Sequence, residues 1–208
     1  MKVRRAVFLD RDGTLSRDVG YPADWSQVHI YPFSFEAVRR IRRAGLAPVV
    51  ITNQSGVGRG FFSEDELGEL HKRFLAAFED QGAPFDGIYH CPHYSQAAGE
   101  GREADCACAK PNPALAVRAA AELGLELSGS YMVGDKPCDI LLGLAIGAVP
   151  VLVLTGYGRL SLADLRSRGV HPAYVADDLA AAAAWIAGRE ERAAGPARTG
   201  RRRNGARS

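Results

Sequence analysis

The stretch from Ala6 to Leu15 constrains the fold of this 208-residue chain more than any other. An apolar, partly β-branched run from Ala6 to Leu9 predicts a buried strand, and it stops abruptly at Asp10 and Asp12. In open α/β sheets, ligands bind beyond the carboxyl ends of the strands, which is where these carboxylates stand. Two carboxylates one residue apart can hold a hard cation such as Mg²⁺ and leave one oxygen free to attack. A solvated Asp-x-Asp-Gly turn is the alternative for this stretch alone.

Other apolar runs along the chain end in polar clusters in the same way. Leu46 to Ile51 predicts a second strand, and it ends at Thr52-Asn53-Gln54-Ser55-Gly56. Tyr131 to Val133 predicts a further strand, which Asp135 and Asp139 follow. A threonine hydroxyl and backbone N–H groups at a strand end can hold phosphoryl oxygens, although a plain polar loop also explains the Thr52 segment in isolation.

Helical patterns alternate with these runs. Ser34 is a predicted N-cap, and Ser63 opens a capping box before an apolar stripe that reaches Phe78. Asn112 as N-cap with Pro113 at the first helical position predicts a helix that stops at Gly124. The alternation predicts an α/β fold with a mainly parallel sheet and helices on both faces. The remaining expected elements are strands at 85–89, 149–154 and 174–175, and helices at 141–146, 161–168 and around Trp185.

Two close pairs of soft ligands flank a polar loop. Cys91-Pro92-His93 is followed, after twelve residues, by Cys106-Ala107-Cys108. Such pairs build closed tetrahedral zinc sites, and with all four positions occupied the metal would hold the loop rather than do chemistry. A disulfide is the competing interpretation, which a cytosolic setting disfavours. Lys110 then lies between a metal-clamped loop and a helix start, so we expect it to face a phosphate rather than solvent.

The charge of the chain is unevenly distributed. Residues 189–208 hold seven arginines and two glutamates, so the net charge of +2 divides into +5 for this segment and −3 for residues 1–188. We therefore expect one domain over residues 1–188, with a zinc loop at 91–108, and a basic disordered tail over 189–208. The acidic domain argues against a nucleic-acid partner except through the tail. Neither a membrane span nor a signal peptide is evident, so we expect a cytoplasmic protein. We also expect it to be a monomer.

These segments resemble the motif set of the haloacid dehalogenase superfamily of phosphatases: hhhhDxDGT, hhhT, a lysine and GDxxxD, where h is apolar. The motifs span most of residues 6–139. The sequence is also similar to a narrower group, the heptose bisphosphate phosphatases and the related histidinol-phosphatase domains. That similarity is carried by Asp10-Arg11-Asp12-Gly13-Thr14, Asp18-Val19-Gly20-Tyr21, Thr52-Asn53-Gln54-Ser55-Gly56, the cysteine/histidine loop and Gly134-Asp135-Lys136.

The resemblance implies a Rossmann-like haloacid dehalogenase fold and a Mg²⁺-dependent phosphomonoester hydrolase that works through an aspartyl-phosphate. Its implied substrate is D-glycero-D-manno-heptose 1,7-bisphosphate, losing the 7-phosphate. Histidinol phosphate or another small phosphomonoester is the alternative, and a DNA 3′-phosphate is a weaker one. The implied site residues are as follows: Asp10 as nucleophile, Asp12 as acid and base, Thr52 and Lys110 as phosphoryl ligands; Asp10, Asp12 and Asp135 for Mg²⁺, with Asp139 behind them; Cys91, His93, Cys106 and Cys108 for Zn²⁺; and Asp18, Val19, Gly20, Tyr21, Asn53, Gln54, Ser55 and Lys136 for the sugar phosphate.

One position departs from the pattern. Where the family has an arginine before the catalytic lysine, this chain has Ala109. We expect residue 109 to face the substrate, so the missing arginine weakens the substrate assignment more than the reaction class. Arg59 is the nearest substitute by sequence. The scattered histidines, His71 among them, read as incidental.

Overall fold

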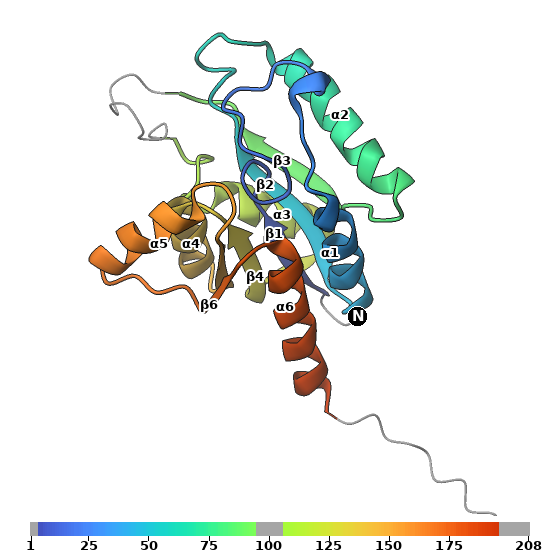
Figure 1. The fold of residues 1–208 in the computed structure, drawn as a ribbon, viewed down its shortest axis with the longest axis vertical. Coiled ribbons are helices and arrows are strands. Elements are labelled where there is room, and N and C mark those ends of the chain that lie inside the picture. The colour runs from blue at the N-terminus through green and yellow to red at the C-terminus, as the bar shows by residue number, and fades with distance from the viewer. Residues whose placement is uncertain (1–3, 95–105, 196–208) are drawn as a thin grey trace, which may run out of the picture.

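The computed structural model describes residues 4–94 and 106–195. Its centre is a six-stranded sheet with the order β3-β2-β1-β4-β5-β6, in which every ladder is parallel (Figure 1). The predicted parallel sheet is therefore confirmed, and the strand that ends at Asp10 lies in its middle. The strands are β1 (Arg4–Leu9), β2 (Ala47–Asn53), β3 (Gly87–Cys91), β4 (Leu125–Gly134), β5 (Val149–Val153) and β6 (Tyr174–Ala176).

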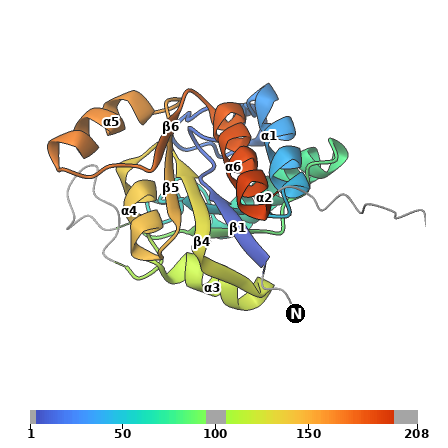
Figure 2. The same cartoon turned by 90° about the horizontal axis from the view of Figure 1, so that it is seen from below.

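Helices cover both faces of the sheet, as predicted. Because side chains alternate along a strand, Val7 and Leu9 of β1 face one cluster of buried apolar residues and Ala6 and Phe8 face the other. Figure 2 shows the two covering layers on opposite sides of the sheet. The helices are α1 (Pro32–Arg43), α2 (Glu64–Asp80), α3 (Ala114–Leu123), α4 (Pro137–Ala145), α5 (Gly158–Ser167) and α6 (Leu179–Ala194), with a short 3-10 helix at Trp25–Gln27.

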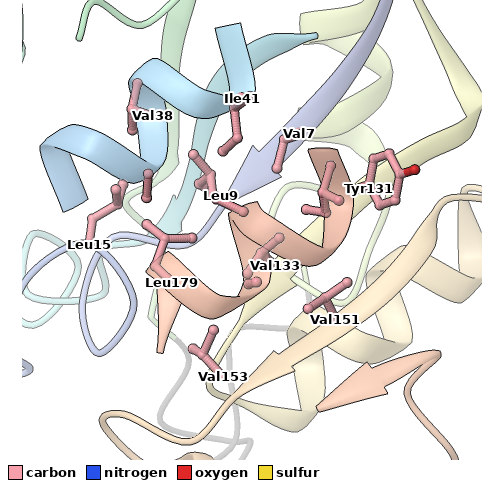
Figure 3. Packing of buried hydrophobic residues seen from close by; sticks show 14 of the residues in the cluster. Val7, Leu9, Leu15, Val38, Ile41, Tyr131, Val133, Val151, Val153 and Leu179 are labelled. Atoms are coloured by element: carbon pink, nitrogen blue, oxygen red, sulfur yellow. The ribbon is translucent and has the colours of Figure 1, made fainter. Parts of the chain in front are cut away.

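The first of these clusters joins α1 and α6 to the sheet. Val38 and Ile41 of α1 and Leu179 of α6 point toward Leu9 of β1 and Val133 of β4 (Figure 3). All of them are fully buried. This close packing fixes the position of β1 relative to the helices, and therefore the position of Asp10, which follows the strand. The second cluster seats α3 and α4 on the other face, with Leu115 of α3 and Leu142 of α4 among its members.

Several element boundaries differ from the prediction. Helix α1 begins at Pro32, so Ser34 lies inside it, and its hydroxyl donates to the Leu15 carbonyl at 2.9 Å instead of capping the helix. Strand β4 is ten residues long, and α4 begins at Pro137 rather than 141. The Ser63 capping box of α2 is confirmed.

The C-terminal helix extends beyond the expected domain boundary at residue 188. Helix α6 continues to Ala194, so residues 189–194 are not a disordered tail. The cause is Glu190, which accepts a hydrogen bond of 2.6 Å from the Tyr131 hydroxyl and pairs with Arg5. The rest of the expected tail, from residue 196, lies outside the described residues. Among the helices of the described ranges, none has the length and apolar character needed to cross a membrane.

Candidate active site

The carboxyl ends of β1, β2 and β4 bring the predicted polar clusters together. Leu9 of β1 is in register with Val50 of β2 and Val133 of β4, and the Asp10 N–H donates to the Val133 carbonyl at 3.0 Å. The side chains that leave this edge are shielded from solvent. Asp10, Thr52, Lys110, Asp135 and Asp139 are each at most 3% exposed. Burial of so many polar groups in one place indicates a functional site, because each buried group needs a partner to offset its lost hydration.

Lys110 joins two of the buried carboxylates. Its Nζ lies 2.8 Å from Asp10 Oδ1 and 2.6 Å from Asp139 Oδ1. Burial alone would raise the pKa of Asp10, but the charges of Lys110 and Lys136 hold that pKa below its ordinary value. Asp10 is therefore ionised at neutral pH, as an attacking oxygen must be.

Asn53 fixes the backbone of Lys110. Its Oδ1 accepts the Lys110 N–H at 3.0 Å, and its Nδ2 donates to the Lys110 carbonyl at 3.2 Å. The amide predicted to contact substrate thus clasps the lysine segment to the end of β2. Ser55 follows in the turn after β2, where its carbonyl accepts the Arg59 N–H at 3.0 Å.

Three of these carboxylates form a cluster that could hold a cation. One oxygen each from Asp10, Asp135 and Asp139 lie within 4.8 Å of one another. Among residues 4–94 and 106–195, Asp135 Oδ1 is buried without a hydrogen-bond partner, whereas Oδ2 accepts the Tyr157 N–H at 2.7 Å. Burial, followed by the negative charge of Asp10, raises the pKa of Asp135 to about 8. A buried, unpartnered carboxylate oxygen beside a second acid fits a hard divalent cation.

The side chain of Asp135 fits only because two of its neighbours are glycines, which have no Cβ. A Cβ on Gly13 would lie 2.2 Å from Asp135 Oδ2, and one on Gly156 would lie 2.1 Å from the same atom. Gly13 also has a φ of 91°, which other residues rarely adopt. The glycine after Asp12 is therefore required by the packing of the acidic cluster as well as by the turn.

The Asp12 carboxylate is held by two neighbours. Arg11 Nη2 lies 2.8 Å and Gln54 Nε2 2.9 Å from Asp12 Oδ2. Gln54 Nε2 also donates to Thr52 Oγ1 at 2.9 Å. Arg11 Nη1 is 3.0 Å from Nε2 of His71, a buried residue of α2. The interpretation of His71 as incidental is therefore wrong.

The loop predicted to contact the sugar lies beside Lys136. Asp18 Oδ2 is 2.9 Å from Lys136 Nζ, and Asp18 Oδ1 accepts the Gly20 N–H at 2.9 Å. Val19 and Tyr21 of this loop are 44% and 43% exposed, which leaves them open to a ligand.

Arg59 approaches the same loop from the turn after β2. Its guanidinium carbon lies 3.6 Å from the Tyr94 ring centre and 5.4 Å from that of Tyr21. Ala109 does not share this open surface. It is 2% exposed and belongs to the second apolar cluster, so the expectation that its side chain faces the substrate is wrong.

The four predicted zinc ligands converge. Ligand atoms of Cys91, His93, Cys106 and Cys108 all lie within 4.8 Å of one another. His93 Nδ1 is 3.1 Å from Cys108 Sγ, and Cys106 Sγ is 3.4 Å from Cys91 Sγ. All four cysteines of the chain are thiols. Three thiols and one imidazole in a closed group are the donor set of a structural zinc site.

Comparisons with known proteins agree with this geometry. Residues 107–182 match the family model described as "HAD-hyrolase-like". A D-glycero-D-manno-heptose-1,7-bisphosphate 7-phosphatase of Thermosynechococcus vestitus is 42% identical over 190 residues, which cover 88% of this chain and 95% of that protein. A D-glycero-beta-D-manno-heptose-1,7-bisphosphate 7-phosphatase of Pasteurella multocida is also 42% identical, over 68% of this chain and 76% of that protein.

A solved structure gives the same result. The D,D-heptose 1,7-bisphosphate phosphatase of B. bronchiseptica, complexed with magnesium and phosphate, superposes with a TM-score of 0.77 at 32% identity. The match covers 89% of this chain and 99% of that one. The chain is thus a phosphoric monoester hydrolase, and it belongs to the D-glycero-D-manno-heptose-1,7-bisphosphate 7-phosphatase family of the haloacid dehalogenase superfamily.

Proposed function

We propose that this chain removes the 7-phosphate of D-glycero-D-manno-heptose 1,7-bisphosphate through an aspartyl-phosphate on Asp10. The observation that carries the proposal is the buried ion pair of Asp10 at the end of the central strand, in which Lys110 Nζ lies 2.8 Å from Asp10 Oδ1 and favours the charged carboxylate. An aspartate in that state can attack phosphorus, and the lysine beside it can neutralise the charge of the transferring group. The relatives named above support the substrate.

The residues at the sheet edge divide the reaction between them. The Asp10 carboxylate forms a bond to phosphorus as the bond to the C7 oxygen of the sugar breaks. Asp12 gives its proton to that oxygen and then takes a proton from the water that hydrolyses the acyl phosphate. Thr52 and Lys110 stabilise the oxygens of the transferring phosphoryl group. Asp139 holds Lys110 in place, since its Oδ1 accepts from Nζ and its Oδ2 accepts the Lys136 N–H at 3.0 Å.

The acidic cluster suits Mg²⁺, the metal in the B. bronchiseptica structure. Asp10, Asp135 and the backbone carbonyl of Asp12 would hold the ion. Oδ1 of Asp135, which has no hydrogen-bond partner in the described part of the chain, is the group that most needs it. When bound, Mg²⁺ offsets the negative charge of the phosphoryl group and of the two carboxylates. We assign Zn²⁺ to Cys91, His93, Cys106 and Cys108, where it would fix the segment that precedes Lys110.

The substrate would lie against the loop of Asp18, Val19, Gly20 and Tyr21. Lys136 would contact the substrate from beside this loop, and Asn53, Gln54 and Ser55 would contact it from the end of β2. Residues 1–188, extended by the rest of α6, would act as one domain. We further propose that the protein works as a cytoplasmic monomer without a membrane or nucleic-acid partner.

A Mg²⁺-dependent phosphate-release assay tests the proposal. The substrates are both anomers of the heptose bisphosphate, histidinol phosphate and a 3′-phosphorylated oligonucleotide. We expect the highest kcat/KM for one bisphosphate anomer, and chelation of Mg²⁺ should abolish turnover. A higher value for histidinol phosphate would keep the reaction and replace the substrate. No release from any of the four would refute the proposal.

A further inference from the structure

We propose that Arg11 and His71 are positioning residues that hold the Asp12 carboxylate in one orientation for proton transfer. The inference rests on the proposed function, because it needs Asp12 as the acid and base. It gives a role to Arg11, the variable position of the Asp-x-Asp-Gly-Thr motif, and to His71, which lies outside the motifs.

The two oxygens of Asp12 are unequally engaged. Oδ2 accepts from Arg11 Nε at 3.1 Å, from Arg11 Nη2 at 2.8 Å and from Gln54 Nε2 at 2.9 Å. Oδ1 accepts only the shared Arg11 Nε–H, at 3.1 Å, among the described residues. A carboxylate oxygen with three donors has little capacity left for a proton, so Oδ1 is the oxygen available for transfer. The arrangement thus selects one oxygen and fixes the side-chain rotamer.

Arg11 can do this only while its own guanidinium is fixed. The side chain is 1% exposed, and its donors are used on three partners. Nε and Nη2 reach Asp12, Nη2 also reaches Gln54 Oε1 at 3.0 Å, and Nη1 reaches His71 Nε2 at 3.0 Å. A guanidinium has donors only, so His71 Nε2 must be the acceptor, and the ring proton lies on Nδ1.

His71 is suited to that role across the working pH range. Burial, followed by the charge of Arg11, lowers the pKa of His71 to about 2, so the ring stays neutral. His71 lies on the apolar face of α2, between Leu70 and Phe74, which are also buried. A polar ring on that face is costly unless it has a partner, and Arg11 is that partner. Helix α2 thereby anchors a group next to the nucleophile, 60 residues earlier in the chain.

The test separates positioning from simple stability by varying the leaving group. For aryl phosphates from phenyl phosphate to p-nitrophenyl phosphate, kcat/KM depends on protonation of the leaving oxygen only when that oxygen is basic. We expect His71→Leu to lower kcat/KM by on the order of tenfold for phenyl phosphate and by about twofold or less for p-nitrophenyl phosphate. His71→Gln, which restores an acceptor, should stay within about threefold of the parent for both.

Two further comparisons identify the cause. Phe74→Leu, on the same helix face, should lower the unfolding temperature without changing the ratio between the two substrates. In an Asp12→Asn background, His71→Leu should leave that ratio unchanged, because the group it positions is already lost. If His71→Leu does not fold, Arg11→Lys, which keeps the charge but loses the fork, should show the same selective loss.

An equal loss on both substrates, or no loss, would overturn the role of Arg11 and His71. A different result would contradict the proposed function. If Asp12→Asn itself slows phenyl and p-nitrophenyl phosphate equally, Asp12 is not the acid, and the positioning role falls with it.

Discussion

Asp10 is the residue whose replacement tests the reaction most directly. Asp10→Asn keeps the shape of the side chain but removes its charge, so kcat should fall by on the order of 10³-fold or more. Lys110 keeps Asp139 as a partner, so the fold should persist, as thermal unfolding will show. Asp86→Asn is the matched control, because Asp86 pairs with Arg4 and Arg42 and touches none of the site residues described above. Substantial residual turnover, free of deamidation, would remove Asp10 from its role.

The raised pKa of Asp135 leads to a prediction of how metal binding depends on pH. In the metal-free protein its pKa is about 8, above the value of about 4 for an unfolded chain. The folded state therefore binds the extra proton, and this group makes the metal-free fold less stable as the pH rises from about 4 to 8. Because Mg²⁺ must displace that proton, its apparent Kd should fall about tenfold per pH unit below pH 8 and then level off.

Calorimetry in buffers of different ionisation enthalpy will measure this linkage. Near pH 6, about one proton should be released for each Mg²⁺ bound, and near pH 9 almost none. The Mg²⁺-induced rise in Tm should likewise be larger near pH 8 than near pH 6. A proton release that does not change with pH would show that Asp135 is ionised before the metal arrives.

Single residues also show where sequence reasoning stops. Asp10, Thr52 and Asp135 could be placed together because each stands at or near the end of a predicted strand, and Lys110 because it closely follows the predicted zinc loop. The contact of Arg11 with His71 could not be predicted from the sequence pattern, because the two residues are 60 positions apart and His71 occupies a core position of α2. The burial of Ala109 was equally hidden, because its environment comes from the packing of α3 on the sheet.

At the scale of elements, the cysteine/histidine loop yields a prediction about stability. Cys106→Ser removes one of four ligands, so zinc content should fall from about one ion per chain and the unfolding temperature should drop. Lys110 follows Cys108 by two residues, so kcat should fall as well. Elemental analysis and thermal unfolding are the measurements, and Cys138→Ser, outside the ligand group, is the control that should retain zinc. Purified protein without zinc but with disulfide-linked thiols would contradict the assignment.

Element boundaries were less predictable than element types. Periodicity and capping correctly located α2, because the Ser63 box and the apolar stripe agree there. The first part of β4 escaped prediction, since Glu126 and Ser128 to Ser130 interrupt its apolar pattern. Pairing with Arg4 and Arg5 of β1 extends that strand, with an irregularity before Val7. In α6, a tertiary contact of Glu190 carries the helix into sequence that reads as a polar tail.

For the whole molecule, the sequence predicts the layers of the fold but not the order of its strands. The alternation of buried strands and amphipathic helices is local, so it is visible in the chain. The order β3-β2-β1-β4-β5-β6 is a property of the packed sheet and becomes evident only there. That order places β1 between β2 and β4, which is why residues from positions 10, 52 and 135 meet.

The distribution of charge over the whole molecule gives a last prediction. Residues 196–208 hold five arginines and no acidic residue, whereas residues 1–195 carry a net charge of −3. Any affinity for DNA should therefore belong to the tail, be weak, and fall steeply with salt, with a logarithmic slope no steeper than about −5. A gel shift of full-length protein at low salt should disappear in a chain ending at Gly195, while kcat/KM for the heptose bisphosphate stays within about twofold. A shift that survives this truncation, together with release of phosphate from a 3′-phosphorylated oligonucleotide, would place nucleic acid at the active site itself.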